Sequence, residues 1–240
     1  MSQSELPIPR IIGHRGLAAF APENTLVGFR KAAELGIKWV EFDIQTTADG
    51  VLVVIHDETL NRTTNGRGPV IAQRYTDIAK LDACSWFKGS RAHEPVPTFE
   101  ATIACLKQYQ LGANIELKPC PGREEETTLK LLDALKTWPE SLPLPLVSSF
   151  SLTCLRIARQ HSSDLHLGLL MDHWCKDWET KYQELNCYSI HFHWRQLSLA
   201  RLEQLRQRGA RVLCYTVNDA FLAKTLWADG VTAVFSDCLV

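Results

Sequence analysis

The chain has 240 residues, of which 45% are hydrophobic and 22% are charged, and its formal net charge is −1. This length and apolar content suit one large globular domain. The near-neutral charge and the lack of a basic stripe argue against nucleic acid or an anionic membrane as partner, and no apolar run reaches the roughly 18 residues of a membrane-spanning helix.

The first part of the chain predicts a strand, a helix and a second strand. Residues 10–14 are mostly apolar and predict the first strand, and residues 39–44 predict the second. The helix is predicted over 23–35, because Pro22 suits a first helical turn and Gly36 suits a helix end.

A hairpin is predicted directly after the second strand. Residues 51–55 form another β-rich run, and Asp49-Gly50 between the two runs is a strong hairpin signal, so this pair of strands should be antiparallel. If Asp49 and Gly50 are the two turn residues, His56 lies directly opposite Asp43 on the neighbouring strand. A shift of one residue would turn His56 to the other face.

An insertion is predicted over residues 57–97, where Asn, Thr, Gly and Pro are frequent and periodicity is weak. We expect it to form a small subdomain over one end of the fold. Beyond it, predicted helices alternate with predicted strands. The helices are expected at 98–109, 123–137, 151–161, 174–185, 198–208 and 219–228, and the strands at 113–117, 144–148, 165–170, 188–192, 211–216 and 232–236.

This alternation predicts the α/β class with a parallel sheet. Setting aside the hairpin strand, eight strands joined by helices favour a closed (β/α)8 TIM-type barrel with a small insertion after the second strand. We therefore expect a single barrel domain over residues 1–240, with an insertion at about 57–97. An open, doubly wound sheet is the alternative, which the missing glycine-rich fingerprint after the first strand disfavours.

Two carboxylates on the second strand predict a metal site. Glu41 and Asp43 are two residues apart and share one face, while Phe42 and Ile44 point the other way, towards helices. Carboxylates aimed into a barrel would repel each other and lose hydration, which a divalent cation would relieve. Alternatively, both lie in water above the packed layer, or they pair with Arg15 and Lys118.

A third carboxylate, Glu116, lies at the end of a later strand, two residues before Lys118. Three carboxylates without a Cys or His cluster describe an oxygen-ligand site, which favours one divalent cation, Mg²⁺ or Ca²⁺. Two histidines accompany it: His14 ends the first strand, and His56 ends the hairpin. We expect His14 and His56 to act as general acid and base on a phosphodiester, with Arg15 binding phosphate oxygens.

A series of motifs resembles the glycerophosphodiester phosphodiesterase family, in particular its bacterial, cytosolic type. The motifs cover nearly the whole chain, in the order Gly13-His14-Arg15-Gly16, Ala21-Pro22-Glu23-Asn24-Thr25, Glu41-Phe42-Asp43, Asp49 to Asp57, Leu60 to Gly66, Ile115-Glu116-Leu117-Lys118, Ser148-Ser149-Phe150, Tyr215-Thr216-Val217-Asn218 and Phe235-Ser236-Asp237.

The resemblance implies a barrel enzyme that hydrolyses glycerophosphodiesters, small-molecule substrates, to sn-glycerol 3-phosphate and an alcohol such as choline or ethanolamine. By motif match, His14 and His56 are the acid–base pair. Glu41, Asp43 and Glu116 bind the metal, and Arg15 and Lys118 contact phosphate.

Some positions lie outside the resemblance or depart from it. Tyr215 stands where the family commonly has Trp, which leaves the preferred alcohol open. His191 and His193 share a strand face and are interpreted as ordinary polar positions rather than a metal pair. The resemblance also suggests the insertion as a lid, in which Trp86 and Phe87 either cover the substrate's alcohol or pack within the insertion.

Two rival functions are a cyclising phospholipase on a similar barrel and a non-catalytic barrel that binds phosphorylated ligands. The sequence does not indicate an oligomeric state. The first residues lack the regions of a secretory signal, and the eight cysteines contain no Cys-x-x-Cys pair. We therefore expect reduced thiols and a cytoplasmic location.

Overall fold

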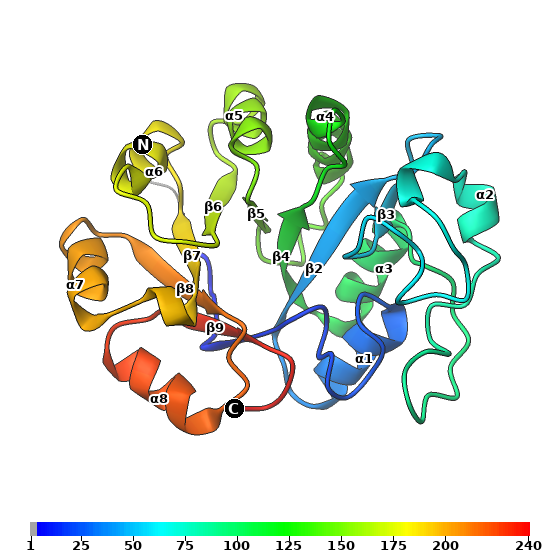
Figure 1. Ribbon diagram of the computed structural model, residues 1–240, viewed down its shortest axis with the longest axis horizontal. Helices are drawn as coiled ribbons and strands as arrows, with labels where there is room; N and C mark the ends of the chain where they lie inside the picture. The colour runs from blue at the N-terminus through cyan, green and yellow to red at the C-terminus, as the bar shows by residue number, and fades with distance from the viewer. Residues whose placement is uncertain (1–3) are drawn as a thin grey trace.

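Eight parallel strands close into a barrel in the computed structural model, which describes residues 4–240. The strands follow one another around the barrel in chain order, and the first pairs with both the second and the last (Figure 1). The (β/α)8 TIM-type barrel is therefore confirmed. The barrel strands are β1 Ile11–Gly13, β2 Trp39–Thr46, β4 Gly112–Leu117, β5 Leu146–Ser149, β6 His166–Met171, β7 Ser189–His193, β8 Arg211–Tyr215 and β9 Ala233–Ser236.

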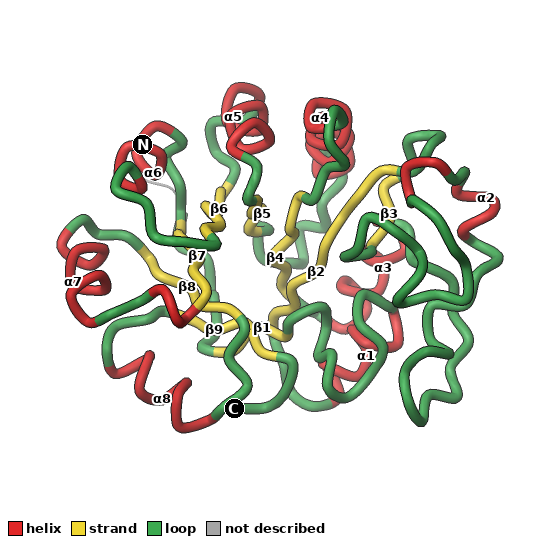
Figure 2. The backbone as a smooth tube through the Cα atoms, in the orientation of Figure 1, coloured by secondary structure: helices red, strands yellow, loops and turns green. Residues whose placement is uncertain are grey.

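Helices surround the barrel and connect its strands (Figure 2). Several begin at the capping residue that their sequence supplies: the side chains of Thr98, Ser151, Ser198 and Asp219 each accept a hydrogen bond from a backbone N–H of the first turn. The helices are α1 Leu26–Glu34, α3 Phe99–Tyr109, α4 Glu124–Leu135, α5 Leu152–His161, α6 Trp178–Glu184, α7 Leu199–Gln207 and α8 Ala220–Ala228, and a 3-10 turn, η2, spans Trp194–Gln196.

Two predicted helices begin later than expected. The expected helix 23–35 begins only at Leu26, because Asn24 adopts a left-handed conformation (φ 54°) and Thr25 caps the helix through Gly28 N. The expected helix 174–185 begins at Trp178. Residues 22–25 therefore form a loop at the end of the barrel where β1 and β2 finish.

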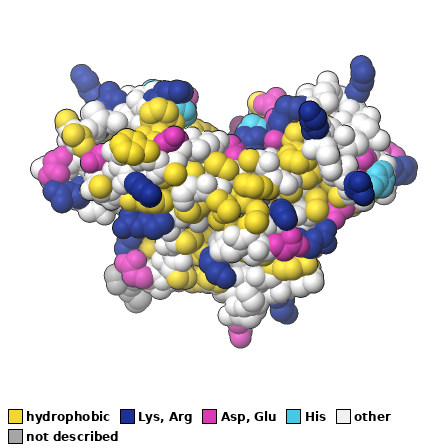
Figure 3. All heavy atoms as spheres, turned by 90° about the horizontal axis from the view of Figure 1, so that it is seen from below, with side chains coloured by type: hydrophobic (Ala, Val, Ile, Leu, Met, Phe, Trp, Pro, Cys, Tyr) yellow, Lys and Arg dark blue, Asp and Glu magenta, His cyan; other side chains and the backbone are white. Residues whose placement is uncertain are grey.

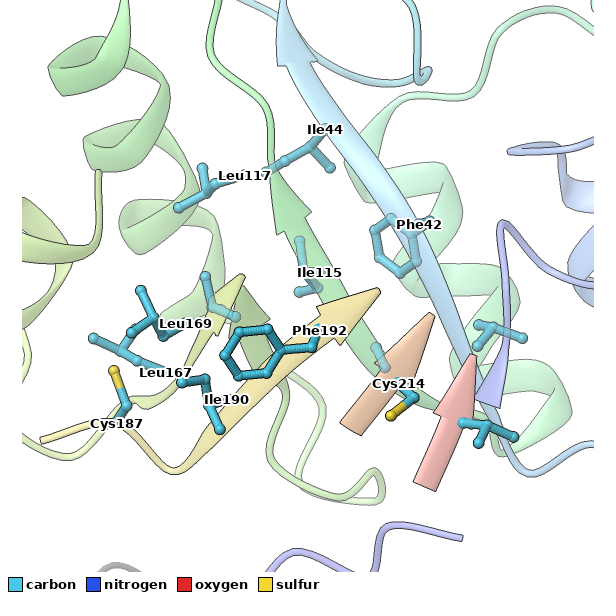
Figure 4. Packing of buried hydrophobic residues seen from close by; sticks show 14 of the residues in the cluster. Phe42, Ile44, Ile115, Leu117, Leu167, Leu169, Cys187, Ile190, Phe192 and Cys214 are labelled. Carbon is cyan, nitrogen blue, oxygen red and sulfur yellow. The ribbon is translucent and has the colours of Figure 1, made fainter. Parts of the chain in front are cut away.

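The core has two layers, one on each face of the barrel wall. Alternate strand residues face outwards and pack against the helices, as Phe42, Ile44, Ile115, Leu117 and Phe192 do in Figure 4. This confirms that Phe42 and Ile44 point away from Glu41 and Asp43. A smaller cluster fills the barrel interior and consists of Leu6, Ile12, Trp39, Leu146, Tyr188, Leu213, Ala233 and Phe235.

The hairpin is antiparallel, as expected, but its predicted register is wrong. β3 (Leu52–Val54) pairs with β2 so that Val54 lies opposite Ile44 and Leu52 opposite Thr46. The loop is one residue longer than the expected two, because Gly50 takes a left-handed conformation (φ 74°) and Val51 N donates to the side chain of Thr47. Residue 55, not His56, therefore lies opposite Asp43.

The segment between β3 and α3 leaves the barrel on the side of β2 and α3 (Figure 1). It contains a 3-10 turn, η1 (Val70–Ala72), and the short helix α2 (Tyr75–Ile78). A hydrophobic cluster of its own holds it against the hairpin, with Leu60, Val70, Ile78 and Val96 packed on Val53 and Ile55.

Candidate active site

Three carboxylates meet inside the barrel at the end where the strands finish. Glu41 and Asp43 project from β2 and Glu116 from β4. The register of these two strands places Asp43 opposite Glu116. One oxygen of each carboxylate lies within 4.8 Å of the others. Among residues 4–240 this is the group of acidic, Cys or His side chains whose geometry suits a metal ion. We call these three residues the carboxylate cluster.

Burial makes this cluster electrostatically unfavourable on its own. Glu41 and Asp43 are only 4% and 1% exposed. Burial, followed by the charges of Asp43 and Glu116, raises the pKa of Glu41 well above its usual value. Burial and Asp43 likewise raise the pKa of Glu116 to about 8. A divalent cation would offset the cost of burying these charges and their mutual repulsion, so the donor set fits a hard metal ion.

An unpaired oxygen supports the same conclusion. Glu41 Oε2 accepts a hydrogen bond from the backbone N–H of Arg15 at 2.9 Å, but Oε1 is buried and has no hydrogen-bond partner within the described chain. Arg15 Nε and Lys118 Nζ lie 3.7 and 3.8 Å from oxygens of Asp43. The expected alternative, pairing with these two cations, therefore applies to Asp43 and leaves Glu41 Oε1 unsatisfied.

A tight turn after β1 carries His14 and Arg15 to the cluster. Arg15 has a left-handed conformation (φ 50°), and Gly16 N donates to Glu41 O, which fastens the turn to β2. A Cβ atom at Gly13 would lie 1.8 Å from Gly16 O, so the turn requires glycine there. The Gly-His-Arg-Gly sequence thus has a structural cause: its glycines allow the turn that presents the two polar side chains.

His14 is oriented by an aspartate from the other end of the chain. Its Nδ1 lies 2.6 Å from Asp237 Oδ1, and Asn218 Nδ2 donates to Asp237 Oδ2 at 2.7 Å. Although burial opposes it, the hydrogen bonds from His14 and Asn218 hold the pKa of Asp237 below its usual value. His14 Nε2 is left facing the cluster, 4.0 Å from Glu41 Oε2.

His56 is held in the same manner by its neighbour in sequence. Its Nδ1 lies 2.8 Å from Asp57 Oδ1, and its Nε2 lies 2.7 Å from Lys118 Nζ. Burial lowers the pKa of His56 below its usual value. Both histidines therefore use Nδ1 for an aspartate, an arrangement that fixes the ring and its tautomer. Nε2 of His14 faces Glu41, whereas Nε2 of His56 contacts Lys118 at the edge of the carboxylate cluster.

His56 reaches the site by a different route from the predicted register. β3 ends at Val54, and the side-chain amide of Gln45 then donates to the carbonyl oxygens of residues 55, 56 and 57 at 2.8 to 3.0 Å. This turns the chain inwards after the strand. The expected neighbourhood of His56 and the carboxylates is present, although the expected reason for it is wrong.

Arg15 belongs to a second layer of charges that links the β1 turn to the insertion. Arg15 Nη1 donates to Glu23 Oε1 at 2.8 Å. Arg62 of the insertion donates to both oxygens of Glu23 and to both oxygens of Asp57 at 2.7 to 2.9 Å. Arg62 thus connects the carboxylate that orients Arg15 with the one that orients His56.

A cavity of about 180 Å³ lies over the carboxylate cluster. Phe150 and Tyr215 form one wall, with their rings edge to face and centroids 6.0 Å apart, and the Tyr215 hydroxyl donates to Met171 O at 2.8 Å. Figure 3 shows the surface hollowed between two raised parts of the molecule, with charged and His side chains in the hollow. The lining residues are His14, Arg15, Glu41, His56, Asn114, Glu116, Lys118, Ser148, Phe150, Leu170, His191, Tyr215, Thr216 and Phe235.

The structure brings the seven predicted site residues together. It separates from them the Trp86–Phe87 pair of the insertion and His193. Trp86 and Phe87 do not line this cavity; they pack edge to face, and Trp86 Nε1 donates to Ala83 O, so they pack within the insertion. The lining contains no residue of 57–97, and the expected lid does not cover the cavity. His193 accepts a hydrogen bond from Arg195 N, away from the buried His191.

Sequence reasoning missed the residues that orient the histidines and Arg15. These residues lie in motifs of the sequence, and no role is predicted for them there: Asp57, Asp237, Glu23 and Arg62. Asp57 had a local signal, since it follows His56 directly. The contact of Asp237 with His14 spans 223 positions and depends on closure of the barrel between β9 and β1.

Comparisons with known proteins show the family of the chain. The model of the glycerophosphoryl diester phosphodiesterase family matches residues 14–239. A glycerophosphodiester phosphodiesterase of Caldanaerobacter subterraneus is 33% identical over 234 residues, covering 95% of this chain and 93% of its own. A relative from Bacillus subtilis with the same name is 30% identical over 244 residues, covering 94% and 82%.

Solved structures show the same fold. An Oleispira antarctica phosphodiesterase in complex with the product sn-glycerol-3-phosphate superposes with a TM-score of 0.92 at 37% identity, covering 95% of this chain and 93% of that one. A glycerophosphodiester phosphodiesterase from Agrobacterium tumefaciens superposes with a TM-score of 0.77 at 26% identity, covering 96% and 97%.

Proposed function

Because the chain belongs to the glycerophosphoryl diester phosphodiesterase family, we propose that it hydrolyses glycerophosphodiesters to sn-glycerol 3-phosphate and an alcohol, with one bound divalent cation and two histidines. The chain is a phosphoric diester hydrolase with glycerophosphodiester phosphodiesterase activity. The observation that carries the finer proposal is the pair of aspartate-held histidines that line one cavity with a buried cluster of three carboxylates.

Glu41, Asp43 and Glu116 would hold the cation, Mg²⁺ or Ca²⁺. The unpaired Glu41 Oε1 and the pKa values of Glu41 and Glu116, which burial and neighbouring carboxylates raise, support this assignment, since a cation there would pair with that oxygen and counter the negative charge. A bound divalent cation neutralises negative charge that develops on phosphoryl oxygens. The three carboxylates offer only oxygen ligands, which suits either of these ions.

His14 and His56 would move the protons. One imidazole takes a proton from the attacking water as its oxygen bonds to phosphorus, and the other gives a proton to the oxygen of the leaving alcohol as its bond to phosphorus breaks. The aspartates on Nδ1 support these roles, because a carboxylate there stabilises an imidazolium that forms during the reaction.

Arg15 and Lys118 would bind the phosphate oxygens of the substrate. Both border the carboxylate cluster and line the cavity. The forked donors of Arg15 suit two oxygens of one phosphate, and Glu23 holds that guanidinium in place. Lys118 Nζ lies between Asp43 and His56, where it can contact a phosphate and His56 together.

The location of the enzyme is part of the proposal. Its eight cysteines are all free thiols, six of them buried, which suits a reducing compartment such as the cytoplasm. Within residues 4–240, no helix is both long and apolar enough to cross a membrane.

The product distinguishes hydrolysis from its two rivals. We expect ³¹P NMR of glycerophosphocholine and glycerophosphoethanolamine, incubated with enzyme and Mg²⁺ or Ca²⁺, to show glycerol 3-phosphate accumulating from both. A cyclic phosphate that persists as the final product would favour the cyclising phospholipase. Unchanged substrates, in folded protein with metal bound, would favour the non-catalytic barrel.

A further inference from the structure

A polar surface lies beside the carboxylate cluster on the inner wall of the barrel, where Asn114 is opposite Glu41 and Ser148 is opposite Glu116. Asn114 on β4, Ser148 on β5 and His191 on β7 are each at most 1% exposed, and all three line the cavity over the cluster. We call these three residues the polar floor. Apolar side chains of the barrel interior surround it, among them Ile12, Leu213 and Phe235 on the other strands. Polar side chains in such a place need partners.

Two atoms of the polar floor have none. Asn114 Nδ2 donates to Ser148 Oγ at 2.9 Å, and His191 Nε2 lies 2.8 Å from Ser189 Oγ. Asn114 Oδ1 and His191 Nδ1 are both buried and have no hydrogen-bond partner within the described residues. Buried polar atoms without partners are rare in native proteins and call for a ligand or a water molecule.

Gly168 creates the room for His191. A Cβ atom at Gly168 on β6 would lie 2.7 Å from His191 Cε1 and 3.0 Å from Ser148 Cβ. The imidazole therefore occupies space that any other residue at position 168 would take, and its opposite side packs on Phe235 with centroids 5.2 Å apart. The ring is held in a fixed position beside Ser148.

The imidazole is neutral in this position, because burial lowers the pKa of His191 to about 3. A neutral imidazole has one N–H donor and one acceptor nitrogen. If the Ser189 hydroxyl donates to Nε2, His191 Nδ1 carries the hydrogen and becomes a free donor. Asn114 Oδ1 is a free acceptor. Together they match a hydroxyl group, which accepts one hydrogen bond and donates another.

The depth of the polar floor suits the glycerol part of the proposed substrate. Asn114 is two residues before Glu116 on β4 and shares its face, which places it opposite Glu41 and roughly 6.6 Å below Glu116 along the strand. A glycerol chain extends three carbons beyond its phosphate ester oxygen. With the phosphate beside the carboxylates, the terminal hydroxyl of the glycerol is the group that reaches this depth.

We propose that Asn114 Oδ1 and His191 Nδ1 bind the terminal hydroxyl of the substrate's glycerol, and that the polar floor thereby selects glycerol diesters. This inference rests on the proposed function. The hydroxyl donates to Asn114 Oδ1 and accepts from His191 Nδ1. A substrate without that hydroxyl leaves both buried atoms unpaired, and discrimination follows from that loss.

The test is a ratio of kcat/KM values for two substrates. One is glycerophosphocholine, and the other is its analogue with hydrogen in place of the terminal hydroxyl, a propane-1,2-diol phosphocholine. The wild-type enzyme should prefer glycerophosphocholine by about 10-fold to 100-fold. His191→Phe keeps a ring of similar size, and Asn114→Ala removes the acceptor; each should reduce this preference by about fivefold or more.

Two further variants separate hydroxyl binding from loss of structure. Gly168→Ala removes no polar atom but displaces the His191 ring, so it should also reduce the preference. His166 on β6 is a second buried histidine; it contacts Ser4 O and lies outside this cavity. His166→Phe should therefore leave the preference unchanged. Circular dichroism should show that all four variants fold.

The outcomes separate this inference from the proposed function. If the wild-type enzyme hydrolyses neither substrate, the proposed function fails. If it hydrolyses both equally well, or if His191→Phe and Asn114→Ala keep the wild-type preference, hydrolysis stands and the hydroxyl-binding role of the polar floor is overturned.

Discussion

Replacing His56 with alanine should lower kcat by about 10²-fold to 10⁴-fold, the range expected for loss of a general acid or base. The cause is removal of the imidazole that lines the cavity over the carboxylate cluster. KM should change much less, because Arg15 and Lys118, which we propose to bind the phosphate, remain. Steady-state kinetics with glycerophosphocholine at saturating metal would measure both constants.

The fold should tolerate this change, because the His56 side chain is 29% exposed and alanine leaves a gap open to the cavity rather than a closed void. His161→Ala is the matched control: this histidine is on the outer helix α5, where its Nδ1 contacts Ile157 O, and its loss should leave kcat unchanged. Full activity in His56→Ala would remove His56 from the mechanism.

Replacing Glu41 with glutamine should abolish metal-dependent activity, with a loss on the order of 10³-fold or more. Glutamine has the same shape but removes one charge from the proposed ligands. Titration calorimetry should show that Mg²⁺ or Ca²⁺ binding is lost. The increase in melting temperature that metal produces in the wild-type protein should disappear as well, since only a ligand that binds the folded state stabilises it.

The same variant should be more stable than the wild-type protein when metal is removed. Burial and neighbouring carboxylates raise the folded-state pKa of Glu41 above its usual value, so the folded protein holds a proton that the unfolded chain releases. The contribution of Glu41 to the stability of the metal-free wild-type protein is therefore fully present below its usual pKa and is lost as pH rises through the raised pKa. Glutamine removes this loss.

Glu184→Gln provides the control for that comparison. Glu184 is on the surface, where it pairs with Arg156, and its loss should change neither metal binding nor the effect of metal on melting temperature. An unchanged metal affinity in Glu41→Gln would show that Glu41 is not a ligand, whatever happens to activity.

The barrel was predictable because its strands and helices alternate with clear local signals. Apolar runs such as 165–170 and 188–192 identified β6 and β7 to within one or two residues at each end. Boundaries were less certain where one residue's conformation decided them, as at Asn24 with its positive φ, which delays the start of α1.

The hairpin shows why register was harder to predict than pairing. Asp49-Gly50 indicated an antiparallel pair, but it did not show that Thr47 would pair with Val51 around a three-residue loop. Asp49 also accepts a hydrogen bond from Tyr75 N, a contact with the insertion that no local pattern contains. Tertiary contacts of this kind set the loop.

The candidate site was predictable where it depends on alternation along one strand, and not where it depends on closure of the barrel. Glu41 and Asp43 were expected on one face because they are two residues apart. The contacts of His14 with Asp237 and of Glu23 with Arg62 join segments that only the three-dimensional fold brings together. The unpaired Nδ1 of His191 likewise could not be predicted, because the room for this ring depends on Gly168 of the neighbouring strand.

Removal and return of metal tests the central claim most directly. Release of glycerol 3-phosphate from glycerophosphocholine would be followed in the wild-type enzyme with chelator, and then after Mg²⁺ or Ca²⁺ is restored. Release that stops with chelator and returns with the cation is the expected result. Undiminished release from fully chelated, folded enzyme would contradict a mechanism based on a cation held by Glu41, Asp43 and Glu116.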